Sequence, residues 1–92
     1  MKLDLEKFSE AYEFAKEAHK NQKRKVSGEP FITHPLAVAE IAFKNGADDD
    51  TIQACFLHDV VEDTDYTIED IEQLFGESVS RIVNGLTKIS HL

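Results

Sequence analysis

The stretch His58-Asp59-Val60-Val61-Glu62-Asp63-Thr64 determines how this sequence is interpreted. On an α-helix, at about 100° per residue, the polar side chains of His58, Asp59, Glu62 and Asp63 fall within about 140° of arc and share one side. Like charges spaced three and four residues apart destabilise a helix unless a cation lies among them. Histidine nitrogen and carboxylate oxygen suit Mn, Fe, Zn or Mg. The stretch therefore predicts a metal site, with the remaining carboxylates available to act on a metal-activated water.

The totals predict a single soluble domain over residues 1–92. The chain has 92 residues, of which 41% are hydrophobic and 30% charged. No run approaches the roughly 18 apolar residues that a membrane span requires. Met1-Lys2 is followed by charged amphipathic sequence, which is unlike a signal peptide. We therefore expect a cytoplasmic protein without a membrane partner.

The charge balance argues against general binding of DNA or RNA, because the net charge is −8 and such binding depends on Lys and Arg. Half of the ten basic residues lie between positions 16 and 25, namely Lys16, Lys20, Lys23, Arg24 and Lys25. A phosphorylated small molecule held between a metal and this cluster fits the pattern. Taken alone, however, such a cluster is more often a solvated basic run that complements the helix dipole.

The periodicity predicts an all-α fold, a compact bundle of about five helices. Asp4 is expected to cap a first helix that runs to about Gln22. A loop follows to Thr33, and the second helix, apolar nearly all round and hence central, ends at Asn45-Gly46. The remaining helices are expected over about 51–63, from a cap at Thr67 to Gly76, and beyond Gly76.

Several single residues have more than one interpretation. His34 precedes Pro35, a position that suits a metal ligand or a capping residue about equally. His19 lies at the edge of an apolar stripe, where a hydrogen-bonded core histidine is favoured over a ligand. Cys55, the single cysteine, is expected to be a buried hydrophobe. The three aspartates from Asp48 to Asp50 lack the layout of a calcium loop and are interpreted as a helix cap.

Four sequence segments together resemble one known family. They are Ser27-Gly28-Glu29-Pro30-Phe31-Ile32-Thr33-His34-Pro35, Leu57-His58-Asp59-Val60-Val61-Glu62-Asp63-Thr64, Phe75-Gly76 and Val83-Asn84-Gly85-Leu86-Thr87-Lys88. In that order they resemble the hydrolase domain of the RelA/SpoT family, within the HD-domain metal-dependent phosphohydrolases. The resemblance implies manganese-dependent removal of pyrophosphate from the 3′ position of the guanine nucleotide (p)ppGpp, an alarmone of the stringent response.

The resemblance also implies roles for individual residues. His34, His58 and Asp59 match three metal ligands of the family, and Glu62 and Asp63 match the pair that activates the attacking water. The basic stretch before Ser27 resembles the contact region for the guanine base and phosphates. Arg24, Lys25 and Ser27 are the substrate-binding candidates that follow from it.

One element of the family pattern is missing. The family's fourth metal ligand is an aspartate several dozen residues after the His-Asp pair, and this sequence has no aspartate at that distance. Asp65, Asp70 and Glu72 lie too close to that pair, and His91 has the wrong type and place. We therefore expect the N-terminal portion of an HD-domain fold, incomplete at its C-terminus.

Two other functions remain open at this point. One is an HD phosphohydrolase that acts on another nucleotide, because the base contacts are the least specific part of the match. The other is a non-catalytic module that binds a nucleotide or a partner through a degraded metal site. Such a module would form a homo-oligomer through its uncovered apolar helix faces.

Overall fold

The computed structural model describes residues 2–90 and consists of five α-helices in this range. They are α1 (Ser9–Ala18), α2 (Thr33–Lys44), α3 (Asp49–Asp63), α4 (Ile68–Phe75) and α5 (Glu77–Ser90). No strand is present in this range, and the one isolated bridge joins Lys23 and Pro30 at the base of a loop. The all-α prediction is confirmed.

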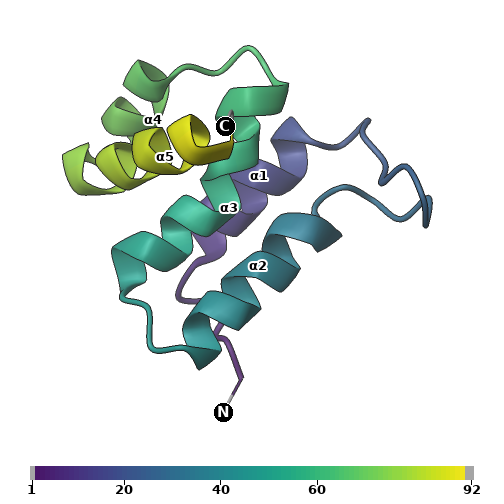
Figure 1. The fold of residues 1–92 in the computed structure, drawn as a ribbon, viewed down its shortest axis with the longest axis horizontal. Coiled ribbons are helices and arrows are strands. Elements are labelled where there is room, and N and C mark those ends of the chain that lie inside the picture. The colour runs from purple at the N-terminus through teal and green to yellow at the C-terminus, as the bar shows by residue number, and fades with distance from the viewer. Residues whose placement is uncertain (1, 91–92) are drawn as a thin grey trace.

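Helix α3 is the centre of the bundle. It packs against α1, α2 and α5, while α4 packs on α5 (Figure 1). Its core side chains are almost inaccessible to solvent, among them Ile52, Phe56, Leu57 and Val60. The prediction that α2 is central is wrong, because α2 packs mainly on α3 and leaves Ile41 62% exposed. Apolar composition alone did not reveal which helix has neighbours on most of its sides.

The helix ends follow local hydrogen bonds. Asp48 caps α3 by accepting the N–H of Thr51 at 2.9 Å, and Thr67 and Asp70 form a capping box at the start of α4. Gly46 follows α2 with a φ of 83°, which glycine adopts without strain. These three helix ends lie where the sequence predicted them.

The start of α1 differs from the prediction. Asp4 does accept a backbone hydrogen bond, from the N–H of Glu6 at 3.0 Å, but the following residues form turns and the α-helix begins only at Ser9. At the other end, His19 donates its N–H to the carbonyl of Ala15 and ends the helix. Helix α1 is therefore shorter than the apolar stripe suggested, and a long connection runs from it to α2.

Candidate metal centre

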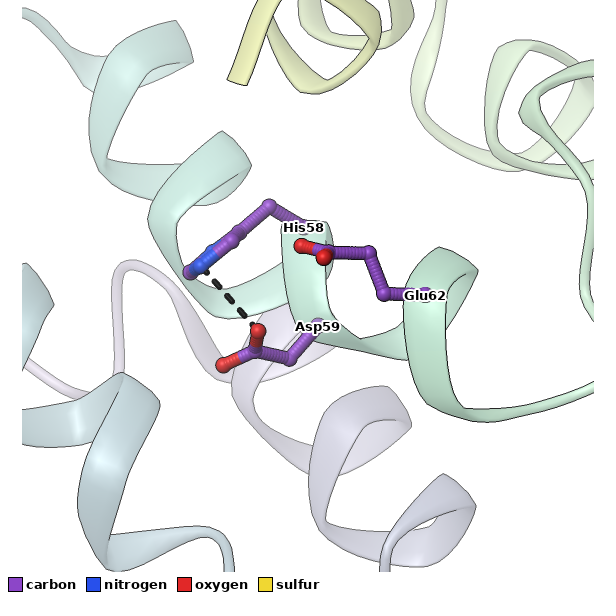
Figure 2. A group of neighbouring side chains, drawn as sticks. All are labelled: His58, Asp59 and Glu62. Carbon is purple, nitrogen blue, oxygen red and sulfur yellow. Dashed lines mark ion pairs between the residues drawn. The ribbon is translucent and has the colours of Figure 1, made fainter. Parts of the chain in front are cut away.

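The candidate metal ligands of α3 converge near its C-terminal end. His58, Asp59 and Glu62 each offer one ligand atom, and these atoms all lie within 4.8 Å of one another. Figure 2 shows the three side chains projecting from adjacent turns of α3 toward a common point. All three are half-buried, so the packed helix holds them while solvent still reaches the site. This geometry matches the helix face that the sequence predicts.

Asp59 lies at the middle of the site. Its Oδ1 is 3.2 Å from Nε2 of His58, and its Oδ2 is 3.4 Å from Nε2 of His34. Its side chain is only 14% exposed, and Oδ2 is buried with no hydrogen-bond partner among the described residues. A buried carboxylate oxygen without a hydrogen bond is unfavourable, and a cation bound between Oδ2 and the nearby imidazoles would compensate for it.

The orientation of His58 supports a metal at this point. Its Nδ1 is 2.9 Å from the backbone carbonyl of Cys55. A carbonyl only accepts hydrogen bonds, so Nδ1 carries a proton, and when the ring is neutral Nε2 presents a lone pair. That lone pair faces Oδ1 of Asp59, which also has only lone pairs, and a divalent cation would satisfy both atoms.

His34 reaches the site from a different helix. It lies in the first turn of α2, where its N–H donates to the carbonyl of Phe31 at 2.9 Å. Because α2 packs along α3, the imidazole of His34 meets Asp59 although the two are far apart in sequence. The structure places the His34 side chain beside the candidate ligands, as the metal-ligand interpretation requires. No side-chain cap hydrogen bond is found at the start of α2.

Burial raises the pKa of the Asp59 carboxyl above its usual value. The neighbouring His58 and His34 act in the opposite direction, and the carboxylates of Asp63 and Glu62 add to the increase. When no cation is bound, the site thus disfavours the negative charge that Asp59 would carry as a metal ligand. A bound divalent ion would reverse this balance.

The predicted catalytic pair occupies two different environments. Glu62 lies within the group of candidate ligands and is half-buried. Asp63 is exposed at the last position of α3, where its Oδ2 accepts a hydrogen bond of 3.4 Å from Nε2 of Gln22. Sequence reasoning did not identify Gln22. Its partner is 41 positions away and no short-range pattern connects them.

The substrate-binding candidates lie on the exposed loop between α1 and α2. Arg24 and Glu29 pair across this loop, by a backbone hydrogen bond of 2.8 Å and a side-chain separation of 4.0 Å. Lys25 and Ser27 are also exposed, and Ser27 Oγ accepts the N–H of Glu29 at 3.3 Å. The loop is rooted beside the metal centre, since the N–H of Phe31 donates to the carbonyl of Gln22 at 2.9 Å.

The remaining candidates are resolved as follows. His19 is 2% exposed and its Nδ1 is 2.9 Å from Oε1 of Gln22, as expected of a hydrogen-bonded core histidine. Cys55 is buried, which confirms that prediction. Asp70 serves the capping box of α4. His91 lies outside the described residues. No helix within residues 2–90 has the length and apolarity to span a bilayer.

Comparisons with known proteins agree with this geometry. The family model described as HD domain matches residues 11–92. A guanosine-3′,5′-bis(diphosphate) 3′-pyrophosphohydrolase of Aquifex aeolicus is 53% identical over 87 residues, which are 95% of this chain and 12% of that protein. The bifunctional (p)ppGpp synthase/hydrolase SpoT of Escherichia coli is 48% identical over 88 residues, 96% of this chain and again 12% of the relative.

A solved structure of a metazoan ortholog of SpoT, described as hydrolysing ppGpp, has a TM-score of 0.82 and 36% identity. The match covers 95% of this chain and 51% of that chain. This chain thus spans about an eighth of the length of the two curated relatives and about half of the solved one. The resemblance to RelA/SpoT hydrolase domains is confirmed, and an HD domain implies a divalent metal. With this family model matching most of its length, the chain belongs to the HD-domain family.

Proposed function

We propose that this chain carries out, or forms part of an enzyme that carries out, metal-dependent removal of the 3′-pyrophosphate of (p)ppGpp. The observation that carries the proposal is the carboxylate of Asp59, which lies near two imidazoles and whose buried Oδ2 has no hydrogen-bond partner among the described residues. The names of the relatives support the choice of substrate. On this proposal, residues 1–92 belong to a single HD-type domain that acts in the cytoplasm during the stringent response.

His34, His58 and Asp59 are the residues that would hold the metal, and Mn²⁺ is the proposed ion. Their ligand atoms come from two helices that pack against each other, so the site depends on the tertiary fold. When bound, the ion would polarise a phosphoryl oxygen and lower the pKa of a coordinated water. The carbonyl of Cys55 supports the site by holding His58 in the tautomer whose Nε2 lone pair is available.

Glu62 and Asp63 are the proposed acid–base pair. In the hydrolysis a water oxygen bonds to the phosphorus nearest the ribose, and the bond between that phosphorus and the 3′ oxygen breaks. The position of Glu62 beside the proposed ligands supports its role as the base that takes the proton from the attacking water. The departing 3′ oxygen needs a proton, and a carboxyl group of the pair returns it. The products are pyrophosphate and GDP or GTP.

Arg24, Lys25 and Ser27 are the proposed contacts to the nucleotide. A guanidinium and an ammonium on an exposed loop can reach phosphate oxygens without the prior expulsion of buried water. The loop is rooted at Gln22 and Phe31, and the Phe31 ring lies 5.6 Å from the His34 ring. A nucleotide bound by the loop would therefore lie next to the metal centre.

The test is release of pyrophosphate from ppGpp by this chain with Mn²⁺ and with EDTA. Glu62→Gln removes the proposed base and keeps the shape, and Glu69→Gln on the exposed face of α4 is the matched control. We expect metal-dependent release that persists in Glu69→Gln and is lost in Glu62→Gln. Equal release by all three proteins would contradict the role of Glu62.

Two other outcomes separate the alternatives. Faster release of phosphate or pyrophosphate from a different nucleotide than from ppGpp would favour an HD phosphohydrolase of other specificity. Thermal stabilisation by Mn²⁺ without turnover of any nucleotide, together with a dimeric mass, would favour a binding module that self-associates. Either result would overturn the proposed activity for this chain.

A further inference from the structure

The side-chain amide of Gln22 accepts one hydrogen bond and donates another. Its Oε1 is 2.9 Å from Nδ1 of His19, and its Nε2 is 3.4 Å from Oδ2 of Asp63. His19 is 2% exposed and belongs to the core, whereas Asp63 is exposed and lies close enough to Asp59 for its charge to act on that carboxyl. One amide therefore connects a buried ring to one of the two carboxylates proposed for catalysis.

The chemistry of the three groups allows one orientation of this amide. A carboxylate only accepts hydrogen bonds, so the NH₂ group of Gln22 must face Asp63. The carbonyl of the amide then faces His19, whose Nδ1 must carry a proton. A flipped amide would set an oxygen against the carboxylate of Asp63, which is repulsive. The other ring nitrogen of His19, Nε2, is buried without a hydrogen-bond partner among the described residues, so Nδ1 carries the polar contact of the ring.

The backbone holds Gln22 in place from both sides. Its N–H donates to the carbonyl of His19 at 2.9 Å, and its carbonyl accepts the N–H of Phe31, also at 2.9 Å. The Phe31 ring packs on the His19 ring at 4.6 Å between centroids and on the His34 ring at 5.6 Å. The residue that contacts Asp63 is therefore anchored at the point where the end of α1 meets the start of α2.

We propose that Gln22 is a positioning residue that orients the carboxylate of Asp63 toward the metal centre, with His19 holding the amide of Gln22. This inference rests on the proposed function, in which Asp63 takes part in proton transfer. An exposed aspartate at a helix end samples several rotamers, and each of them places the carboxylate differently. A reacting group displaced by about 1 Å can slow a reaction by about 100-fold. The hydrogen bond from Gln22 restricts Asp63 to one of these positions.

The first test is a double-mutant cycle on kcat for ppGpp. Gln22→Glu keeps an acceptor for His19 but replaces the donor with a carboxylate that repels Asp63. We expect kcat to fall about 10- to 100-fold, as for other residues that orient a site, with little change in KM. In an Asp63→Asn background the same substitution should change kcat less than about twofold, because the two residues act as one unit. Gln73→Glu, an identical change on the exposed face of α4, is the control.

Two kinetic results would overturn the inference. An equal loss of kcat in both backgrounds would show that Gln22 does not act through Asp63. A rise in KM with unchanged kcat would make Gln22 a substrate contact and not a positioning residue.

The second test needs neither turnover nor metal. In isotope-labelled protein with EDTA, NMR should report the Nδ1–H tautomer of His19, and Asp63→Ala should shift the side-chain amide resonances of Gln22. Unchanged Gln22 resonances in Asp63→Ala would contradict the contact itself. If the parent chain releases no pyrophosphate, the proposed function fails, and this measurement still decides whether Gln22 holds Asp63.

Discussion

The C-terminal turns of α3 and the loop over residues 23–30 both carry candidate site residues, but they hold them in opposite ways. The side chains of His58 and Asp59 are 16% and 14% exposed and lie on the most enclosed helix of the bundle. On the loop, the Arg24 side chain is 42% exposed and Val26 is fully exposed. Figure 1 shows α3 in the middle of the molecule and the connection from α1 to α2 extending away from it.

This difference indicates a division of work. Charges on a buried scaffold interact strongly and are screened little by salt, whereas charges on an exposed loop interact weakly and are screened. The α3 site is therefore suited to hold a metal and to move protons. The loop is suited to capture a charged nucleotide. Substitutions in the two regions should change different measured quantities.

Asp59→Ala should have the largest effect, because it removes the proposed ligand at the centre of the α3 site. We expect turnover of ppGpp to fall by more than about 100-fold, which exceeds the loss usual when a hydrogen-bond partner of a metal ligand is removed. In the parent, Mn²⁺ at about 100 times its Kd should add about 2.7 kcal/mol to the free energy of unfolding. Thermal melts with and without Mn²⁺ measure this gain, which the variant should lack. A Tm rise equal to that of the parent would exclude Asp59 as a ligand.

Glu62→Gln should separate metal binding from proton transfer within the same site. General acid–base catalysis contributes about 10²- to 10⁴-fold, so kcat should fall by a factor in that range. The Tm rise with Mn²⁺ should be largely retained, because the amide oxygen still occupies the position of the carboxylate. Pyrophosphate release and thermal melts on the same preparation test both statements. If metal stabilisation disappears together with activity, Glu62 is a ligand, consistent with its place beside His58 and Asp59.

Arg24→Ala and Lys25→Ala should affect capture of the nucleotide. A hydrogen bond to a charged group contributes about 1.5–3 kcal/mol, so KM should rise by roughly 10- to 100-fold while kcat changes little. The increase should shrink at high salt, because both side chains are exposed. Steady-state kinetics at two ionic strengths measure this, with Lys44→Ala, an exposed lysine at the end of α2, as the control. A loss of kcat at unchanged KM would place these residues in the chemical step.

The smallest expected effect concerns the stability of the metal-free protein. Burial raises the pKa of the Asp59 carboxyl, so the folded state binds a proton on this group more tightly than the unfolded state does. The resulting stability is fully present below the unfolded pKa and is lost as pH rises through the folded pKa. Asp59→Asn lacks this dependence and should exceed the parent in stability at pH 7, with a gap that narrows as pH falls. Urea unfolding in EDTA at several pH values tests this; a gap independent of pH would contradict it.

The sequence predicted the architecture well because its signals are local. The cap at Asp48, the capping box of Thr67 and Asp70, and the glycine after α2 each depend on neighbours within a few residues. Local signals were weaker at the start of α1, where apolar spacing continued through residues that form turns. They also misidentified α2 as the central helix, because an apolar composition does not specify how many neighbours a helix has.

The sequence by itself determined that His58, Asp59 and Glu62 share one side of a helix, because Glu62 follows Asp59 by three positions and His58 by four, and the helical repeat brings such positions together. Only the tertiary structure decided that His34 meets Asp59, that Oδ2 of Asp59 is buried with no hydrogen-bond partner within residues 2–90, and that Gln22 contacts Asp63. These contacts join α3 to α2 and to the connection that follows α1. They depend on how apolar helix faces pack, which no short sequence pattern specifies.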